Sequence, residues 1–155
     1  MRMFFLTGGA VVFLDQVSKW LVVKFLPLHS SVAVIPGFFN LVHVRNTGAA
    51  FSFLAGGYST WRQIFFVTVS IAGMAVILYI HQGLKGEERW ARGSLALIFG
   101  GALGNLIDRL RLGEVIDFLD VFVGPYHWPA FNVADSAISI GAVLLLLFLL
   151  RSPRK

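Results

Sequence analysis

The chain has 155 residues, of which 57% are hydrophobic and only 14% are charged. Soluble domains contain about a quarter charged residues, so this composition predicts an integral membrane protein, with one membrane domain over residues 1–155. The net charge is +5 and there is no cysteine. Thiol catalysis, disulfides and Cys-ligated zinc are therefore excluded, and we expect no nucleic-acid partner.

Four apolar segments reach or approach the roughly 20 residues that a helix needs to cross a bilayer. They are residues 4–26, 63–80, 93–109 and 132–150, of which the third is short and rich in glycine. The orientation of such helices follows from the Lys and Arg residues at their ends, because the richer side stays in the cytoplasm. The richer side holds both termini, so segments 28–62 and 110–131 are expected to face outward.

The first segment carries two charged residues, Asp15 and Lys19, in "FLDQVSKW". They are four residues apart, so they lie on one face of a helix and can pair, which lowers the cost of placing both in a membrane. This spacing favours a structural ion pair that faces the helix bundle over a direct catalytic role.

The first outer segment, residues 28–62, combines β-branched and aromatic residues with turn signals. Its stretch "FFNLVHV" approaches the alternation of a strand, which predicts short strands and a small sheet at the membrane face. The following "VRNTGAAFSF" contains Asn46, whose side chain offers a donor and an acceptor. Asn–Thr–Gly is also typical of a turn, so the residues alone leave a binding role and a turn open.

The third segment contains "GGALGNLIDRL". Gly100 and Gly104 have the spacing that lets another helix approach closely. Asn105 and Arg109 lie four residues apart, on one face near the outer helix end. An amide and a guanidinium there could hold a peptide backbone or a carboxylate, although Arg109 could also simply extend toward the membrane surface.

Two acids stand among large apolar residues on either side of one outer segment. Asp117 lies in "GEVIDFLDVF", and Asp135 lies in "FNVAD", three residues after Asn132. Two close carboxylates cannot readily both ionise, so one would keep a proton while the other activates water, which is aspartic-peptidase chemistry. Alternatively, Asp135 could be a helix first-turn acid and Asp117 an exposed loop acid.

The stretches "DQVSK", "VRNTGAAFS", "GGALGNLIDRLRLGEVIDF" and "FNVADS" occur in this order. Together they closely resemble the prolipoprotein signal peptidase family, also called signal peptidase II. The resemblance implies four transmembrane helices with a small outward-facing β-rich cradle. It also implies an aspartic endopeptidase of the bacterial inner membrane, which cuts the signal peptide from prolipoproteins just before the diacylglyceryl cysteine.

The resemblance also assigns roles to residues. It implies that Asp117 and Asp135 are catalytic. Substrate-binding positions would be Asn46, Asn105, Arg109 and Asn132, and supporting positions would be Asp15, Lys19 and Asp108. It further implies no metal or organic cofactor, contact with membrane lipid, and inhibition by the peptide antibiotic globomycin. Nothing in the sequence requires an oligomer, so we expect a monomer.

Two other classes of protein remain open on the residues alone. A small proton- or cation-coupled transporter could use Asp15, Asp108 and Asp135 as an ion path. It would spread its acids through the depth of the membrane, whereas most acids here lie toward one face. A non-enzymatic membrane scaffold could use the glycine faces, but it leaves the Asp, Asn and Arg residues without a role.

Overall fold

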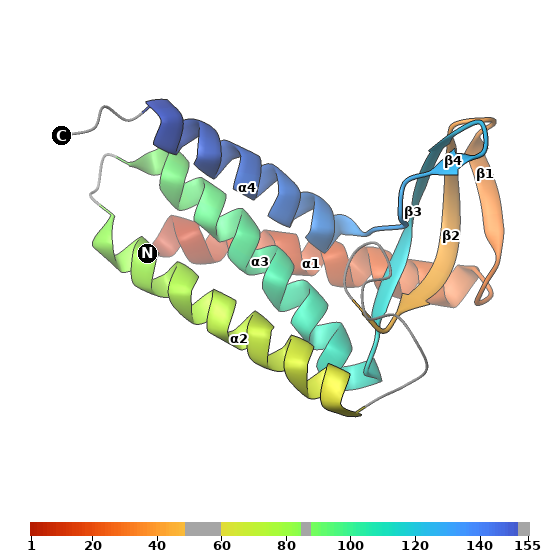
Figure 1. Ribbon diagram of the computed structural model, residues 1–155, viewed down its shortest axis with the longest axis horizontal. Helices are drawn as coiled ribbons and strands as arrows, with labels where there is room; N and C mark the ends of the chain where they lie inside the picture. The colour runs from red at the N-terminus through yellow and green to blue at the C-terminus, as the bar shows by residue number, and fades with distance from the viewer. Residues whose placement is uncertain (49–59, 85–87, 152–155) are drawn as a thin grey trace.

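The computed structural model of the chain describes residues 1–48, 60–84 and 88–151. These residues form helices α1 (Arg2–Phe25), α2 (Thr60–Gly83), α3 (Arg89–Leu112) and α4 (Val133–Arg151), and strands β1 (Ser31–Ile35), β2 (Phe39–Asn46), β3 (Val115–Val123) and β4 (Tyr126–His127). The helices lie side by side and the sheet stands at one end of them (Figure 1). The start of α1 and the end of α4 lie at the other end. The predicted helical membrane fold with a small sheet is confirmed.

Within the described ranges, three helices are long and apolar enough to cross a membrane: α1, α2 and α4. The helix α3 has 24 residues, the same length as α1 and α2, but its ends carry several charged residues. It lies between the others and packs against all three. It is longer at both ends than the predicted 93–109, because the helix continues into these charged residues until Gly113. Gly113 adopts the left-handed conformation that commonly ends a helix.

The helices expose apolar side chains and bury their charged residues, an arrangement that suits a bilayer. The buried residues of α1 recur every three or four positions and therefore form one face: Phe4, Gly8, Val11, Asp15 and Lys19. Large apolar side chains such as Phe5, Phe13 and Leu14 are exposed on the opposite side. Lipid would cover these exposed residues, so the charged pair of α1 lies inside the bundle.

The glycines of α3 allow the helices to approach closely, as their spacing predicted. A Cβ atom on Gly100 would lie 2.6 Å from the carbonyl oxygen of Gly8 in α1. A Cβ atom on Gly104 would lie 2.6 Å from the Asp15 carboxylate. Any side chain at Gly104 would therefore push α1 and its carboxylate away from α3.

The sheet joins the two outer segments, in the order β1-β2-β3-β4. All its strand pairs are antiparallel. The first outer segment supplies β1 and β2, which confirms the strands predicted there, while residues 49–59 of that segment lie outside the described residues. The second outer segment supplies β3, in which Asp117 is paired with Val44 of β2. This pairing brings Asp117 next to Asn46, at the end of β2.

Candidate active site

Asp117 lies in β3 and is 3% exposed. Its Oδ1 accepts a hydrogen bond of 2.7 Å from the side-chain amide of Asn132. Its Oδ2 accepts one of 3.1 Å from the amide of Asn46. The alternative that Asp117 is an exposed loop acid is wrong, because the pairing of β3 with β2 buries it.

Asp135 lies in the first turn of α4, which confirms the prediction that it could be a first-turn acid of a helix. Its backbone N–H donates to Asn132 Oδ1 at 2.9 Å, and its Oδ2 accepts from the Asn132 backbone N–H at 3.3 Å. This reciprocal arrangement is a capping box. The helix α4 begins at Val133, one residue after the predicted start at residue 132, so Asn132 directly precedes it. The capping box fixes the position of the Asp135 carboxylate.

Asn132 links the two acids directly. It is fully buried, and it donates from its side chain to Asp117 and from its backbone to Asp135. Asn105 of α3 completes the arrangement, because its amide donates to Asp135 Oδ1 at 2.8 Å and its oxygen accepts from Asn132 at 3.2 Å. Strand β3 also holds the segment before α4, through the N–H groups of Phe118 and Leu119, which both donate to the carbonyl of Phe131.

A cavity of about 650 Å³ opens beside these acids. Five of the predicted site residues line it: Asn46, Asn105, Arg109, Asp117 and Asp135. The sixth, Asn132, lies behind the acids. Arg109 donates to the carbonyl oxygen of Gly48 at 3.4 Å, and its guanidinium lies 5.2 Å from the centre of the Phe66 ring. Arg109 therefore faces the same space as both carboxylates. Asn46 has both of its predicted characters: its Oδ1 accepts a 2.9 Å turn bond from the Gly48 N–H, and its amide contacts Asp117.

The electrostatics of the site favour a protonated Asp117. Burial, and then the negative charge of Asp135, raise the pKa of Asp117 from 3.8 to about 7. The hydrogen bonds from Asn46 and Asn132 and the charge of Lys19 act in the opposite direction and do not outweigh burial. Asp117 can therefore hold a proton near neutral pH.

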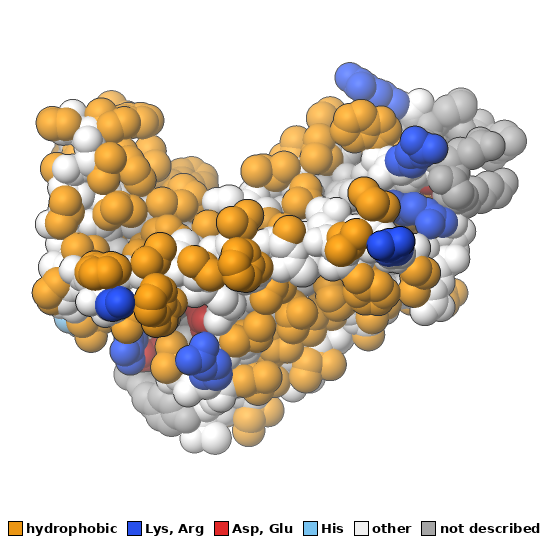
Figure 2. Space-filling view, turned by 180° about the vertical axis from the view of Figure 1, so that it is seen from behind, with side chains coloured by type: hydrophobic (Ala, Val, Ile, Leu, Met, Phe, Trp, Pro, Cys, Tyr) orange, Lys and Arg blue, Asp and Glu red, His pale blue; other side chains and the backbone are white. Residues whose placement is uncertain are grey.

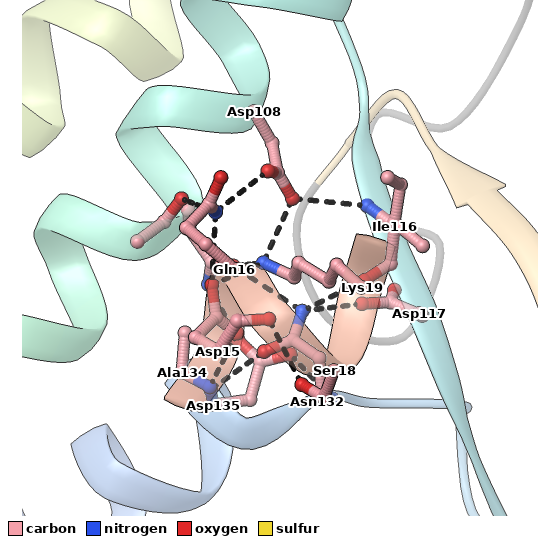
Figure 3. A network of polar contacts seen from close by, with 12 residues as sticks. Asp15, Gln16, Ser18, Lys19, Asp108, Ile116, Asp117, Asn132, Ala134 and Asp135 are labelled. Atoms are coloured by element: carbon pink, nitrogen blue, oxygen red, sulfur yellow. Dashed lines mark hydrogen bonds and ion pairs between the residues drawn. The ribbon is translucent and has the colours of Figure 1, made fainter. Parts of the chain in front are cut away.

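The predicted supporting residues form a second cluster next to the acids (Figure 3). The Lys19 ammonium lies 2.8 Å from Asp15 and 2.7 Å from Asp108, which confirms the pair predicted from the Asp15 and Lys19 spacing. Its third hydrogen bond goes to Asn105 Oδ1 at 3.0 Å. Asp15 also accepts from the Ala134 N–H at 2.9 Å, and Asp108 from the Ile116 N–H at 3.3 Å. The cluster thus ties α1 and α3 to β3 and α4.

The remaining acids of the second outer segment lie away from the cavity. Asp120 accepts from Asn40 at 3.0 Å and contacts His127 Nδ1 at 2.8 Å. Glu114 lies 3.6 Å from Arg45. An extended strand points alternate residues to opposite faces, which explains why Asp117 and Asp120 have different partners.

Sequence reasoning missed Gln16 and the segment from Trp128 to Phe131. Gln16 donates to Asp15, to Asp108 and to the Gly104 carbonyl, at 3.2, 3.0 and 3.2 Å. Its polar side chain within an apolar helix was a signal that was available. Residues 128–131 line one side of the cavity, and no pattern in the sequence marks them as wall residues. Within residues 1–48, 60–84 and 88–151, no group of three or more His, Asp or Glu residues could hold a metal ion.

Comparison with known proteins decides the family. The family model for signal peptidase (SPase) II matches residues 8–151. The chain belongs to the signal peptidase II family. It is 49% identical over 154 residues to the lipoprotein signal peptidase of Geobacter metallireducens, which covers 99% of this chain and 94% of the relative. It is 51% identical over 147 residues to that of Geobacter sulfurreducens, covering 95% and 90%.

Solved structures agree with this assignment. A bacterial membrane enzyme solved by the in meso method superposes with a TM-score of 0.85 at 33% identity, covering 100% of this chain and 94% of the other. A second such structure gives 0.82 at 34%, covering 99% and 96%. A signal peptidase II is a protease, and together with three membrane-capable helices the family supports a bacterial inner-membrane protein. These matches do not support the transporter alternative.

Proposed function

We propose that this signal peptidase II is an aspartic endopeptidase that removes the signal peptide from diacylglyceryl-modified prolipoproteins, cutting just before the lipidated cysteine. Asp117 and Asp135 are its catalytic pair. The observation that carries the proposal is the double contact of Asn132, which donates to both carboxylates at the wall of one cavity. Family membership supports the substrate class, and this geometry supports the aspartic mechanism.

The two acids have different environments, which assigns them different roles. Asp117 is the more deeply buried, and its raised pKa favours the neutral acid. Asp135 accepts from the Asn105 amide and the Asn132 N–H, and it lies at the positive N-terminal end of α4. Because Asp117 keeps its proton, we assign Asp135 the role of general base and Asp117 that of general acid.

The reaction then follows from these protonation states. The Asp135 carboxylate takes a proton from water as the water oxygen attacks the scissile carbonyl carbon. The Asp117 proton passes to the carbonyl oxygen, which gives a neutral tetrahedral intermediate. When the C–N bond breaks, Asp135 returns its proton to the leaving amine and Asp117 recovers its own from the hydroxyl. One water is consumed and no other reactant is needed, so the proposal requires no metal or organic cofactor.

The cavity walls suit a lipidated peptide. Asn46 and Arg109 offer amide and guanidinium donors for the backbone carbonyls of an unwound peptide, which need partners away from water. Ile138 and Ile140 of α4 line the same cavity and offer apolar contact for the substrate's acyl chains. Globomycin, a lipophilic peptide, should occupy this cavity and compete with substrate.

We propose that the sheet and the active site face outward and that the helix ends opposite the sheet face the cytoplasm. These opposite ends carry Arg2, Arg89, Arg92 and Arg151, and the sequence adds Lys85, Arg154 and Lys155 beside them. They exceed the Lys and Arg residues of the sheet side, namely Lys24, Arg45, Arg62, Arg109 and Arg111, in agreement with the positive-inside rule. Because the chain has no cysteine, Ser30→Cys and Gln82→Cys can each be labelled alone in intact cells. Ser30→Cys should react from outside and Gln82→Cys should not; equal labelling of both would contradict this topology.

The direct test is cleavage of a purified diacylglyceryl prolipoprotein by the purified chain in detergent. We expect a cut immediately before the lipidated cysteine, unchanged by exhaustive chelation and blocked by globomycin. If the chain elutes as a monomer and that fraction cleaves the substrate, the result supports a monomeric enzyme. Loss of cleavage on chelation, with rescue by one divalent ion, would replace the aspartic mechanism by metal-activated water.

A further inference from the structure

The ends of the helices farthest from the sheet carry a second binding feature, unrelated to the two acids. Figure 2 shows Lys and Arg side chains gathered at this end, beside the hydrophobic side chains that cover the helices. Two adjoining cavities open here, of about 510 and 480 Å³. Thr7, Arg89 and Gly93 line both, so the two form one groove between α1, α3 and α4.

One half of this groove is cationic. Arg2, Arg89 and Arg92 line the first cavity. Arg92 donates to the Leu84 carbonyl at 2.6 Å. Glu88, which precedes Arg89 in the sequence, lines neither cavity. Three guanidinium groups around one cavity form a surface that matches the geometry and charge of a phosphate.

The other half of the groove is apolar. The second cavity runs along Gly93, Leu97 and Leu144, with the exposed indole of Trp90 at its rim. Gly93 leaves the floor of the groove open, since a Cβ atom built on it meets no atom within 4 Å. Trp side chains favour the boundary between headgroups and acyl chains, so the groove passes from a polar to an apolar region at that boundary.

We propose that this groove binds one anionic phospholipid of the surrounding leaflet. Its phosphate contacts Arg2 and Arg89, and one acyl chain lies over Gly93 toward Leu97 and Leu144. Basic pockets between transmembrane helices on the cytoplasmic side suit anionic headgroups. A signal peptide is a poor occupant, because its own N-terminal region is positively charged and would be repelled. Only the assignment to the inner leaflet depends on the proposed topology.

Native mass spectrometry of the purified full chain tests the proposal. The chain is incubated with phosphatidylglycerol or with phosphatidylcholine of the same acyl chains. We expect one phosphatidylglycerol to be retained with a preference of about tenfold or more, because each arginine contributes about fivefold near anionic lipid. The double variant Arg2→Gln, Arg89→Gln should lose this preference. The double variant Arg111→Gln, Arg151→Gln removes the same charge outside the groove and should keep it.

A second pair of variants tests the acyl chain site. Gly93→Leu fills the floor of the groove, where its Cβ meets no atom within 4 Å, and should reduce lipid retention at least fivefold. Gly73→Leu makes the same change in α2, at a glycine whose Cβ position is also open, and should have no effect. Each variant is first shown to unfold at the wild-type temperature in phosphatidylcholine. Phosphatidylglycerol should raise that temperature for the wild type and for Gly73→Leu, but not for Gly93→Leu.

Three results would overturn the proposal. The first is equal retention of both lipids by the wild type, and the second is unchanged retention of phosphatidylglycerol by the Arg2→Gln, Arg89→Gln variant. The third is that deacylated glycerophosphoglycerol displaces the bound lipid as well as intact phosphatidylglycerol does. The last would reduce the feature to a site for free phosphate anions. Prolipoprotein cleavage in phosphatidylcholine micelles is measured on the same variants and should be unchanged, so a failure of the peptidase assignment would appear separately from a failure of lipid binding.

Discussion

Two clusters of carboxylates lie next to each other in this protein, and their negative charges are compensated in different ways. Asp15 and Asp108 share the ammonium of Lys19, which is 2% exposed and uses all three of its protons on Asp15, Asp108 and Asn105. Among the described residues, the hydrogen bonds to Asp117 and Asp135 come from amide and backbone donors of Asn46, Asn105 and Asn132. Arg109 lines their cavity, but its described hydrogen bond goes to Gly48.

This comparison shows how neighbouring acids can have separate roles. An ammonium supplies both a compensating positive charge and hydrogen-bond donors to the carboxylates around it. Amides orient a carboxylate but carry no charge, so burial and the second acid still favour proton retention at Asp117. Asn105 connects the clusters, because Lys19 and Asn132 occupy its oxygen and so direct its NH₂ group toward Asp135. The first cluster thereby orients the second.

The sharpest test of this contrast is to remove the proton exchange without changing shape. Asp117→Asn and Asp135→Asn should each lower the single-turnover cleavage rate by about 10³-fold or more, since general acid–base catalysis alone contributes about 10²–10⁴-fold. Both variants should remain folded and bind globomycin to some degree. If Asp117→Asn cleaves at more than about a tenth of the wild-type rate, Asp117 is not the acid.

The Lys19 cluster should respond in stability. Lys19→Met leaves Asp15 and Asp108 facing each other without a cation and should cost about 3–5 kcal/mol, measured by thermal unfolding in detergent. Asp108→Asn should lose stability at least as clearly as cleavage rate. Combining it with Lys19→Met should recover part of the loss, because one of the two buried charges is then gone. Additive losses in the double variant would contradict a shared ammonium.

Arg109 tests whether the cavity residues act on substrate or on the fold. Arg109→Ala should reduce kcat/KM by roughly 10–100-fold, because it removes a donor expected to contact the peptide. Asn105→Ala should reduce it similarly, through lost orientation of Asp135. Arg109→Lys keeps the charge but not the planar fork, so it should recover only part of the activity. If either alanine variant is mainly unfolded in detergent, the residue is structural instead.

The pH profile should report the raised pKa of Asp117. If cleavage needs the protonated acid, kcat/KM should fall about tenfold per pH unit above about 7. Stability should also fall as pH rises from about 4 to 7, because the unfolded acid ionises first; the rise in pKa from 3.8 to about 7 corresponds to roughly 4 kcal/mol. In Asp117→Asn this slope should disappear, while a persisting slope would assign it to another group.

Sequence alone predicted the helices better than their ends. The apolar runs located all four, but α2 and α3 continue beyond them into polar and charged residues at both ends. The Asp15 and Lys19 pair was predictable because i, i+4 spacing is local. Asp108 as the third partner was not, since it depends on the packing of α3 against α1 across Gly104.

The site shows the same division between local and distant information. The capping box of Asn132 and Asp135 has a local signature, a polar cap with an acid three residues later. The spacing could not choose between Asp117 and Asp120, because the choice depends on the register of β3 with β2 and on whether the stretch is a strand or a helix. That register is set by residues far apart in the chain, and only the family resemblance anticipated its result.

Asp120 should give the smallest effect and is the matched control for Asp117. It lies in the same strand, 8% exposed, but it contacts Asn40 and His127. Asp120→Asn keeps an oxygen for Asn40 and loses only the charge facing His127, whose half-exposed pair is worth about 1 kcal/mol or less. Cleavage should stay within about twofold of wild type, and the unfolding temperature should fall slightly.

Glu114→Gln, which loses the 3.6 Å contact with Arg45, should behave like Asp120→Asn. All are measured by single turnover beside Asp117→Asn. An inactive but folded Asp120→Asn together with an active Asp117→Asn would exchange their roles and move the catalytic pair to the other face of β3.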